Sequence, residues 1–328
     1  MANTEKCIAT GANLGRGNLM SWPSSFSRYL LAAGISLWLA SPTASAAPGD
    51  PDPSFGVGGL VLHTPGSLSL NISNQPASLI ELSDGKLLVA GHSENGQEVN
   101  GVADTDILLA RYLADGQLDT SFGHQGIITT PTSTAYTKVS GMLEHADGKL
   151  LVYGVNSQAS DYDKGMVARY LPDGRLDPDF ADGGILTLPM GNAHDQINAA
   201  LQQADGKIVL AGSGAFSADD FVLARLNTDG TLDTTFGTDG MVITDFGGGD
   251  FAHALIEQDG KLVAVGQGGS GIAIARYLAD GSPDTSFDDD GIRHLDIASG
   301  YDGAFSVYAL GNGQLLVGAR TGNTMSSL

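Results

Sequence analysis

Four arginines stand inside apolar segments of this sequence, and each is followed eight residues later by an aspartate. A guanidinium and a carboxylate can form a two-point, charge-assisted pair, for which arginine is better suited than lysine. An active site is rarely copied identically along a chain, so we interpret the pairs as structural links between a strand and the loop that follows it. The pairs are Arg111 and Asp119, Arg169 and Asp177, Arg225 and Asp233, and Arg276 and Asp284, with Asp52 as a fifth aspartate.

Three glutamates, Glu81, Glu144 and Glu257, occupy one equivalent position shortly before repeated Asp-Gly turns. The other two units have Gln202 and Ala309 at this position. If the position faces a common axis of the repeats, three carboxylates lie at one level, where like charges would favour the binding of a cation. The sequence thus predicts a metal site at these glutamates, with calcium as the candidate ion and no other cofactor. The alternative is that the side chains lie in water near the turns and form no site.

Two acidic clusters offer weaker candidates for metal binding. Asp219 and Asp220 form one, and Asp288, Asp289 and Asp290 form the other, but neither has the distal glutamate of a calcium-binding loop. We interpret both as solvated loops. The seven histidines lack the spacing of zinc ligands, and no Gly-x-Ser-x-Gly motif stands between a strand and a helix.

The elements that must position these residues are short strands arranged in a repeat. Residues 204–244 show the unit: three apolar runs of four to six residues, bounded by Asp-Gly turns and by a Leu-Asp-x-x-Phe-Gly loop. Such runs indicate buried strands, and Asp-Gly between two of them is a hairpin signal, because glycine adopts a positive φ without steric cost. A unit of this kind cannot bury its own apolar faces, so it must be arrayed with copies of itself.

The count of strands suggests a closed structure. Four full units are followed by a fifth that begins at Ala304 and lacks its last strand, while residues 59–64 supply one spare last-type strand at the other end. Pairing the two closes an all-β propeller of five four-stranded blades, with about 55 residues per blade. The third strand of the fifth blade is worn: residues 324–328 stand at its place without the arginine and tyrosine.

The combined motif resembles the delta-60 repeat of exported bacterial proteins. The resemblance rests on ADGKIVLAG, FVLARLNTDG and LDTTFGTDG, and it covers about residues 51–320. It implies a propeller-like β fold and a surface or extracellular location, and it implies no catalytic residues. The sequence departs from the pattern at Ala181 and Asp288, which replace the glycine after the repeated phenylalanine, and in the worn fifth unit.

The first 46 residues have the composition of a secretory signal peptide and leader. Residues 29–40 are apolar but too few to span a membrane, and Ala44 and Ala46 are small residues suited to a cleavage site. We expect residues 47–328 to form a single propeller domain that is secreted, periplasmic or on the cell surface. The one cysteine, Cys7, lies in the leader, so the mature chain must fold without disulfides.

The formal net charge of −21 argues against nucleic acid or an anionic membrane surface as a partner. We expect an exported, non-enzymatic binding or cell-surface interaction module whose ligand is a protein or a glycan. One alternative is a glycoside-active enzyme with paired carboxylates in the propeller channel. Its carboxylates should interrupt the repeat, and Asp195, Asp250 and Asp302 are the best candidates. The other alternative is a purely structural repeat protein.

Overall fold

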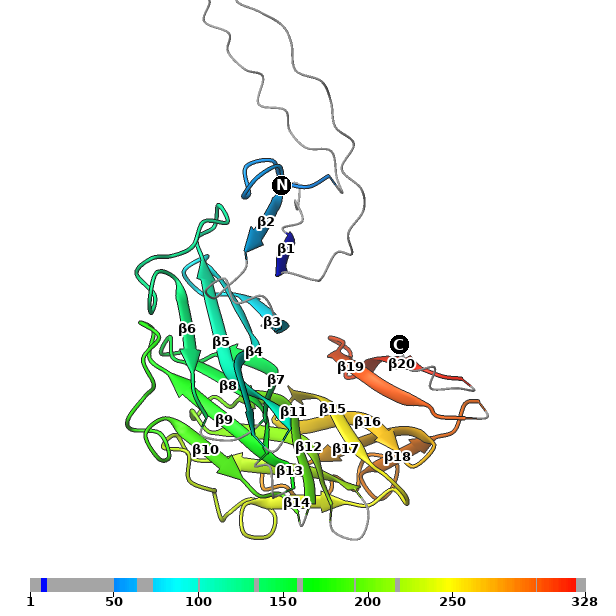
Figure 1. Cartoon of the computed structure of the whole chain (residues 1–328). Coiled ribbons are helices and arrows are strands. Elements are labelled where there is room, and N and C mark those ends of the chain that lie inside the picture. The colour runs from blue at the N-terminus through cyan, green and yellow to red at the C-terminus, as the bar shows by residue number, and fades with distance from the viewer. Residues whose placement is uncertain are drawn as a thin grey trace, which may run out of the picture. The chain divides into compact units, whose positions relative to one another are not determined.

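The computed structural model describes residues 7–10, 50–63, 73–99, 101–132, 136–157, 162–191, 193–215, 219–298 and 300–322. The predicted apolar segment 29–40, the predicted cleavage near Ala46 and the worn strand at 324–328 lie outside these ranges. Every regular helix or strand among the described residues is a β-strand (Figure 1). No helix of the described part has the length and apolar character needed to cross a membrane.

Four antiparallel sheets of four strands follow one another along residues 74–295. The first contains β3 (Asn74–Glu81), β4 (Leu87–Val99), β5 (Val102–Tyr112) and β6 (Ile127–Thr130). The second contains β7 (Tyr136–Glu144), β8 (Leu150–Ser157), β9 (Lys164–Tyr170) and β10 (Ile185–Leu188). The third contains β11 (Ala193–Gln202), β12 (Ile208–Ala215), β13 (Asp219–Leu226) and β14 (Met241–Thr244). The fourth contains β15 (Phe251–Gln258), β16 (Lys261–Gly268), β17 (Gly271–Tyr277) and β18 (Ile292–Leu295).

These sheets confirm the predicted all-β fold of repeated blades. In each sheet the strands pair in chain order, so every blade is a simple antiparallel meander. A fifth sheet, described as β19 (Gly303–Ala309) and β20 (Leu315–Arg320), continues the series. Its strands correspond to the first two of a blade, as the sequence predicted for the unit that begins near Ala304.

In each four-stranded sheet, a glycine ends the apolar run of the second strand because the first strand bulges against it. In the third sheet the pairing shifts between Ile197 and Ala199, opposite Gly212. A Cβ on Gly212 would lie 1.8 Å from the carbonyl oxygen of Gln196, so no larger residue fits. The same bulge and the same close approach occur at Gly91, Gly154 and Gly266.

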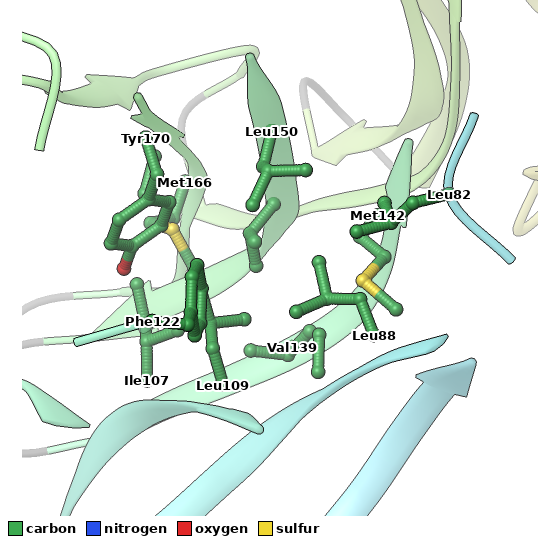
Figure 2. Close-up of a cluster of buried hydrophobic side chains, with 13 residues drawn as sticks. Leu82, Leu88, Ile107, Leu109, Phe122, Val139, Met142, Leu150, Met166 and Tyr170 are labelled. Atoms are coloured by element: carbon green, nitrogen blue, oxygen red, sulfur yellow. The ribbon is translucent and has the colours of Figure 1, made fainter. Parts of the chain in front are cut away.

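The apolar side chains are buried between successive sheets rather than within one. Leu88 and Ile107 of the first sheet and Val139 and Met166 of the second belong to one such cluster, shown in Figure 2. Further clusters join the second sheet to the third, the third to the fourth, and the fourth to the fifth. Middle strands such as β9 are buried on both faces, which explains their unbroken apolar sequence.

Residues 1–64 form a unit of their own. The strand predicted at residues 59–64 exists as β2 (Leu60–His63), and its partner is β1 (Cys7–Thr10), with Cys7 opposite Leu60 in a parallel pair. This pairing was not expected, because β1 lies in the predicted leader, which export would remove. Closure of the propeller by this strand stays a prediction.

Candidate functional site

Each four-stranded sheet has two ends that carry different residues. We call the end at which the first and second strands join the turn end, and the end at which the second and third strands join the loop end. In the third sheet, Arg225 pairs with Val209 near the start of β12, so it lies towards the turn end. Asp220 pairs with Gly214 near the other end of β12, so it lies at the loop end.

At the turn end, the repeated arginine and aspartate form the predicted pair. In the third sheet the Nε of Arg225 lies 2.7 Å from Oδ2 of Asp233, and the guanidinium stands 4.6 Å from the ring centre of Phe236. A second cation, Lys207 of the Asp-Gly-Lys hairpin, reaches the same carboxylate oxygen at 2.8 Å. The other three sheets repeat the group as Lys86, Arg111, Asp119 and Phe122, as Lys149, Arg169, Asp177 and Phe180, and as Lys261, Arg276, Asp284 and Phe287.

This turn-end group also links each sheet to the next. Nη1 of Arg111 donates a hydrogen bond of 2.6 Å to the carbonyl oxygen of Pro172 in the second sheet's turn. In the same turn, a Cβ on Gly174 would lie 2.8 Å from the ring of Phe122, so only glycine fits beneath that ring. Arg169 and Arg225 make the equivalent bonds to Thr228 and Ala279. These contacts confirm the structural interpretation of the arginine–aspartate pairs.

The surroundings of the repeated aspartates at the turn end keep their carboxylates ionised. Burial alone would raise the pKa of Asp119, but hydrogen bonds from Ser121 and the charges of Arg111 and Lys86 outweigh it and lower this pKa to about 2. The pKa values of Asp177, Asp233 and Asp284 are lowered as well. Carboxylates held ionised in this way are suited to structural ion pairs rather than to proton transfer near neutral pH.

Two of the three glutamates proposed as a cation site, Glu144 and Glu257, make contacts with the preceding sheet. Both oxygens of Glu144 accept hydrogen bonds from Ser83, from its N–H at 2.7 Å and from its hydroxyl at 2.9 Å. Glu257 likewise accepts from the amide of Gln203 at 3.5 Å. Glu81 is exposed. These contacts give the position a structural role between hairpins, and a calcium site at Glu81, Glu144 and Glu257 stays a prediction.

Three buried aspartates at the loop end turn out to be a repeat themselves. Asp195, Asp250 and Asp302 are fully buried and occupy one equivalent position, at or just before the start of the first strand of the third, fourth and fifth sheets. Each carboxylate accepts an N–H from the loop that precedes its strand, from Met190 at 2.9 Å, Phe246 at 2.6 Å and Ile297 at 2.8 Å. The expectation that they interrupt the repeat was therefore wrong, because each fastens the connection between two sheets.

Around one of these aspartates the loop end becomes distinctive. Carboxylate oxygens of Asp220, Asp245 and Asp250 all lie within 4.8 Å of one another. Asp250 accepts a further N–H, that of Gly269, at 2.8 Å, and Asp245 accepts that of Gly247 at 2.7 Å. Asp220 is only 7% exposed, so its interpretation as part of a solvated loop was wrong. That interpretation does hold for Asp288, Asp289 and Asp290, which are exposed.

The pKa values of the two buried members of this acidic trio are raised. Burial is the largest cause for Asp220, followed by the charges of Asp245 and Asp250. Burial is also the largest cause for Asp250; the N–H groups of Phe246 and Gly269 counteract it, and Asp245 adds to it. The trio thus places two mostly buried carboxylates beside an exposed one without a cation in an ion pair among the described residues, which is the opposite of the compensated turn end.

A cleft of about 540 Å³ opens beside the trio, at the loop end of the fourth sheet. Its apolar walls include Phe251 and Tyr301, and its polar groups include Gln267 and Ser270. Glycines fill the rest of the lining, namely Gly248, Gly249 and Gly269. The N–H bond from Gly269 to Asp250 connects the cleft wall to the trio.

Sequence reasoning missed the cleft because its residues come from separate loops. The run of Gly247, Gly248 and Gly249 precedes a strand, which argues against a phosphate-binding loop and suggests no other ligand. Tyr301 and Phe251 stand at the entries to successive sheets and share no motif. The one available signal was the acidic pair Asp219 and Asp220, at the start of a strand where the second sheet has Asp163 and Lys164.

Comparison with known proteins supports the repeat and the fold. Residues 82–122, 145–180, 203–236 and 257–287 match a family described as "Domain of unknown function (DUF5122) beta-propeller". No curated protein sequence matches the chain. Among solved structures, the chain is similar to virginiamycin B lyase from Staphylococcus aureus, with 14% identity and a TM-score of 0.43 over 75% of this chain and 67% of that one. Another is an endo-arabinase from Bacteroides thetaiotaomicron, with 11% identity and a TM-score of 0.42 over 78% of this chain and 92% of that one. At these identities no activity is transferred to this chain.

Proposed function

We propose that this propeller-repeat protein is an exported, non-enzymatic binding module of delta-60 type, and that it holds a glycan in the cleft at the loop end of the fourth sheet. The observation that carries the proposal is the composition of the cleft, in which two aromatic rings stand beside an amide and a hydroxyl. Aromatic rings bury the apolar faces of a sugar, while amides and hydroxyls exchange hydrogen bonds with its hydroxyl groups. A volume of about 540 Å³ lies in the range of small-molecule sites.

Further ring contacts hold the Phe251 side of the cleft in place. The ring of Phe251 lies parallel to that of His253, with their centres 6.4 Å apart, and His253 stacks on Phe305 at 4.9 Å. Burial lowers the pKa of His253, so this imidazole is neutral at pH 7. A wall fixed in this way loses little freedom when a ligand stacks on it, which favours binding.

Charge restricts the class of ligand. The chain carries a formal net charge of −21, and the acidic trio adjoins the cleft through Asp250. A sulfated or phosphorylated ligand would be repelled by this field, while a neutral or amino sugar would not. A glycan without anionic groups therefore fits the cleft best.

The experiment is a glycan array on the purified protein, followed by calorimetric titration of the best neutral oligosaccharide. Tyr301→Ala removes an exposed ring from the cleft and should weaken binding at least tenfold. Tyr162→Ala is the matched control, because Tyr162 has the same exposure, 59%, and is not part of the cleft. Absence of any glycan binding, or equal losses in both variants, would overturn the glycan assignment.

The same samples separate binding from catalysis. The glycoside-active alternative requires that a bound oligosaccharide is cleaved, so chromatography of the sugar after long incubation should return it intact. If shorter products are released and Tyr301→Ala abolishes their release, the protein is a glycoside-active enzyme and not a binding module.

The proposal of export rests on the composition of the first 46 residues. Expression of the full chain in a bacterium should yield a periplasmic or secreted protein whose first residue is Ala47 or lies within a few residues of it. Mass spectrometry of the intact protein measures this directly. An uncleaved leader in the exported fraction, or retention of the whole protein in the cytoplasm, would contradict export.

A further inference from the structure

Two equivalent junctions between sheets differ in one charged residue. The N–H of Asp195 donates to the carbonyl oxygen of Asp163 at 3.0 Å, and the N–H of Asp250 donates to that of Asp219 at 2.7 Å. The residues that follow these two acceptors, Lys164 and Asp220, are therefore equivalent. Each also precedes the repeated arginine of its strand by five residues. A lysine at one junction thus corresponds to an aspartate at the other.

The lysine has a clear role at its own junction. Its Nζ lies 3.4 Å from Oδ2 of Asp195, whose side chain is fully buried. A buried carboxylate is costly unless a cation or hydrogen bonds compensate it, and Lys164 supplies that cation while keeping its own side chain 26% exposed. The junction between the second and third sheets is therefore electrically compensated.

The junction between the third and fourth sheets has no such ion pair in the described part of the chain, and the charge of His294 is only the last of the influences on the pKa of Asp250. Asp220 takes the place of the lysine, and Asp245 from the loop after β14 adds a third carboxylate to the pair. None of the ion pairs among the described residues includes Asp220, Asp245 or Asp250. Asp220 accepts no hydrogen bond from the described part of the chain although it is more than nine-tenths buried. The carboxylate of Asp220 is therefore directed at two other carboxylates and forms no ion pair with the described residues that would compensate its charge.

We propose that Asp220, Asp245 and Asp250 bind a divalent cation, calcium, which does at this junction what the ammonium of Lys164 does at the preceding one. All the ligand atoms are carboxylate oxygens, a set that suits calcium and not the softer transition metals. Both oxygens of Asp220 and one oxygen of Asp245 are available, and each oxygen of Asp250 keeps a lone pair beside the N–H it accepts. Water and backbone carbonyls complete the coordination of calcium in such sites.

The ion would also fix the walls of the cleft. Asp245 and Asp250 enclose the run of Gly247, Gly248 and Gly249, and Asp250 holds Gly269 through its N–H. These glycines include three lining residues of the cleft. A cation that draws the carboxylates together therefore orders the loops on which any ligand of the cleft depends. This inference does not require that the ligand is a glycan.

The experiment is calorimetric titration of calcium chloride into the full chain after treatment with EDTA, with thermal melts recorded in parallel. The parent protein should bind one calcium ion at this site, and its Tm should rise with calcium concentration, because an ion that binds only the folded state stabilises it. Asp220→Asn should weaken calcium binding at least tenfold. Magnesium at equal concentration should give a smaller rise in Tm, since it demands a tighter octahedral site.

The decisive variant is Asp220→Lys, which copies the lysine of the preceding junction. It should bind no calcium at this site, and its Tm should be independent of calcium and at least as high as that of the parent in EDTA. A variant that carries Glu81→Gln, Glu144→Gln and Glu257→Gln together tests the other candidate calcium site, and its calcium binding at the acidic trio should equal that of the parent.

Three results would overturn the proposal. One is the absence of both binding heat and a calcium-dependent Tm in the parent protein. Another is parental calcium affinity in Asp220→Lys, and the third is loss of binding in the glutamate variant alone. If Asp220→Lys does not fold, Asp245→Asn takes its place. This variant should keep the fold, because Asp245 is exposed and its one described hydrogen bond is accepted from the N–H of Gly247. It should also lose calcium binding.

Discussion

The turn end and the loop end of the sheets use carboxylates in opposite ways. At the turn end of each four-stranded sheet, one buried aspartate receives both an arginine and a lysine, and the arrangement is the same four times. At the loop end, the partner of the buried aspartate changes from sheet to sheet: a lysine at Asp195, two more aspartates at Asp250. Among the described residues, the acidic trio at the loop end occurs once.

This difference indicates which end supports the fold and which can carry a function. A group that occurs in every blade contributes the same contacts to every junction. It therefore stabilises the fold but does not distinguish one blade from another as a binding site. A ligand needs a place that differs from its equivalents, and the cleft and the acidic trio lie together at such a place. The comparison therefore predicts large, uniform effects on stability at the turn end and smaller, ion-dependent effects at the loop end.

The largest effect is expected from Asp177→Ala at the turn end. The side chain of Asp177 is 1% exposed and compensates both Arg169 and Lys149, so its removal leaves a buried guanidinium without its carboxylate. Breaking a buried pair from one side costs about 3–5 kcal/mol. Urea unfolding should show this loss, whereas Arg175→Ala, which breaks an exposed pair with Asp173, should cost less than about 1 kcal/mol. Equal losses in the two variants would show that the buried ion pair contributes no more to stability than the exposed one.

Acid should weaken the turn end next. A carboxylate whose pKa is lower in the folded than in the unfolded protein stabilises the fold fully above its unfolded pKa and loses that contribution as the pH falls through its folded pKa. For Asp119 this window runs from about pH 4 down to about pH 2, and its contribution is about 2 kcal/mol at most. In urea unfolding between pH 6 and pH 2, the stability difference between the parent and Asp119→Asn should shrink towards pH 2. A difference that does not change with pH would show that Asp119 stabilises the fold by packing alone.

Lys164→Ala tests the compensated junction of the loop end. It leaves the fully buried Asp195 with hydrogen bonds but without its cation, and the lost side chain is partly exposed, so a loss of about 1–2 kcal/mol is expected in urea unfolding. Lys138→Ala, which removes an exposed lysine of β7, should change stability by less than about 0.5 kcal/mol. Addition of calcium should not rescue Lys164→Ala, because the described residues of that junction offer no carboxylates equivalent to Asp220 and Asp245. Rescue by calcium would mean that one aspartate and its loop suffice to bind the ion.

The repeat made the fold and the turn end predictable. Runs such as those of β8 and β9 showed buried strands, and the constant interval from Arg111 to Asp119 indicated their pair. The lysine of the Asp-Gly-Lys hairpin is visible in the sequence as a repeated cation but not as a second partner of that aspartate, because its distance along the chain varies from 23 residues in one sheet to 33 in another.

The loop end could not be predicted in the same way. Periodicity identifies what recurs, whereas the trio occurs once in the described part of the chain and the cleft is lined by separate loops. Asp220 and Asp250 are brought together by the pairing of two sheets, and the sequence around Asp220 has the composition of an ordinary polar loop. The register shift of the first strands, which fixes Asp195 and Asp250 at one position, becomes visible only in the paired sheets. The predicted closure by residues 59–64 stays a prediction; the partner that the described residues give β2 is β1.

The smallest effect is expected where the repeat itself departs from its pattern. Ala181 follows Phe180 with a φ of 47°, the left-handed conformation that Gly237 adopts at 58° in the equivalent loop. A left-handed conformation costs a residue with a Cβ about 1–2 kcal/mol, while glycine adds flexibility to the unfolded chain worth about 0.4–1 kcal/mol. Ala181→Gly should therefore raise the free energy of unfolding by about 0.5 kcal/mol, measured by urea unfolding.

The reverse change at the equivalent loop completes this test. Gly237→Ala places a Cβ 2.2 Å from the carbonyl oxygen of Met241, so the loop must shift and the loss should exceed about 1 kcal/mol. The loop also carries a link to the next sheet, since the N–H of Gly237 donates to Asp280 and that of Ala181 donates to Asp229. If Ala181→Gly lowers stability instead, packing of the alanine methyl group outweighs its backbone strain. The turn end would then depend on side-chain contacts that differ between blades. Both ends of the sheets would vary along the chain, the loop end more than the turn end.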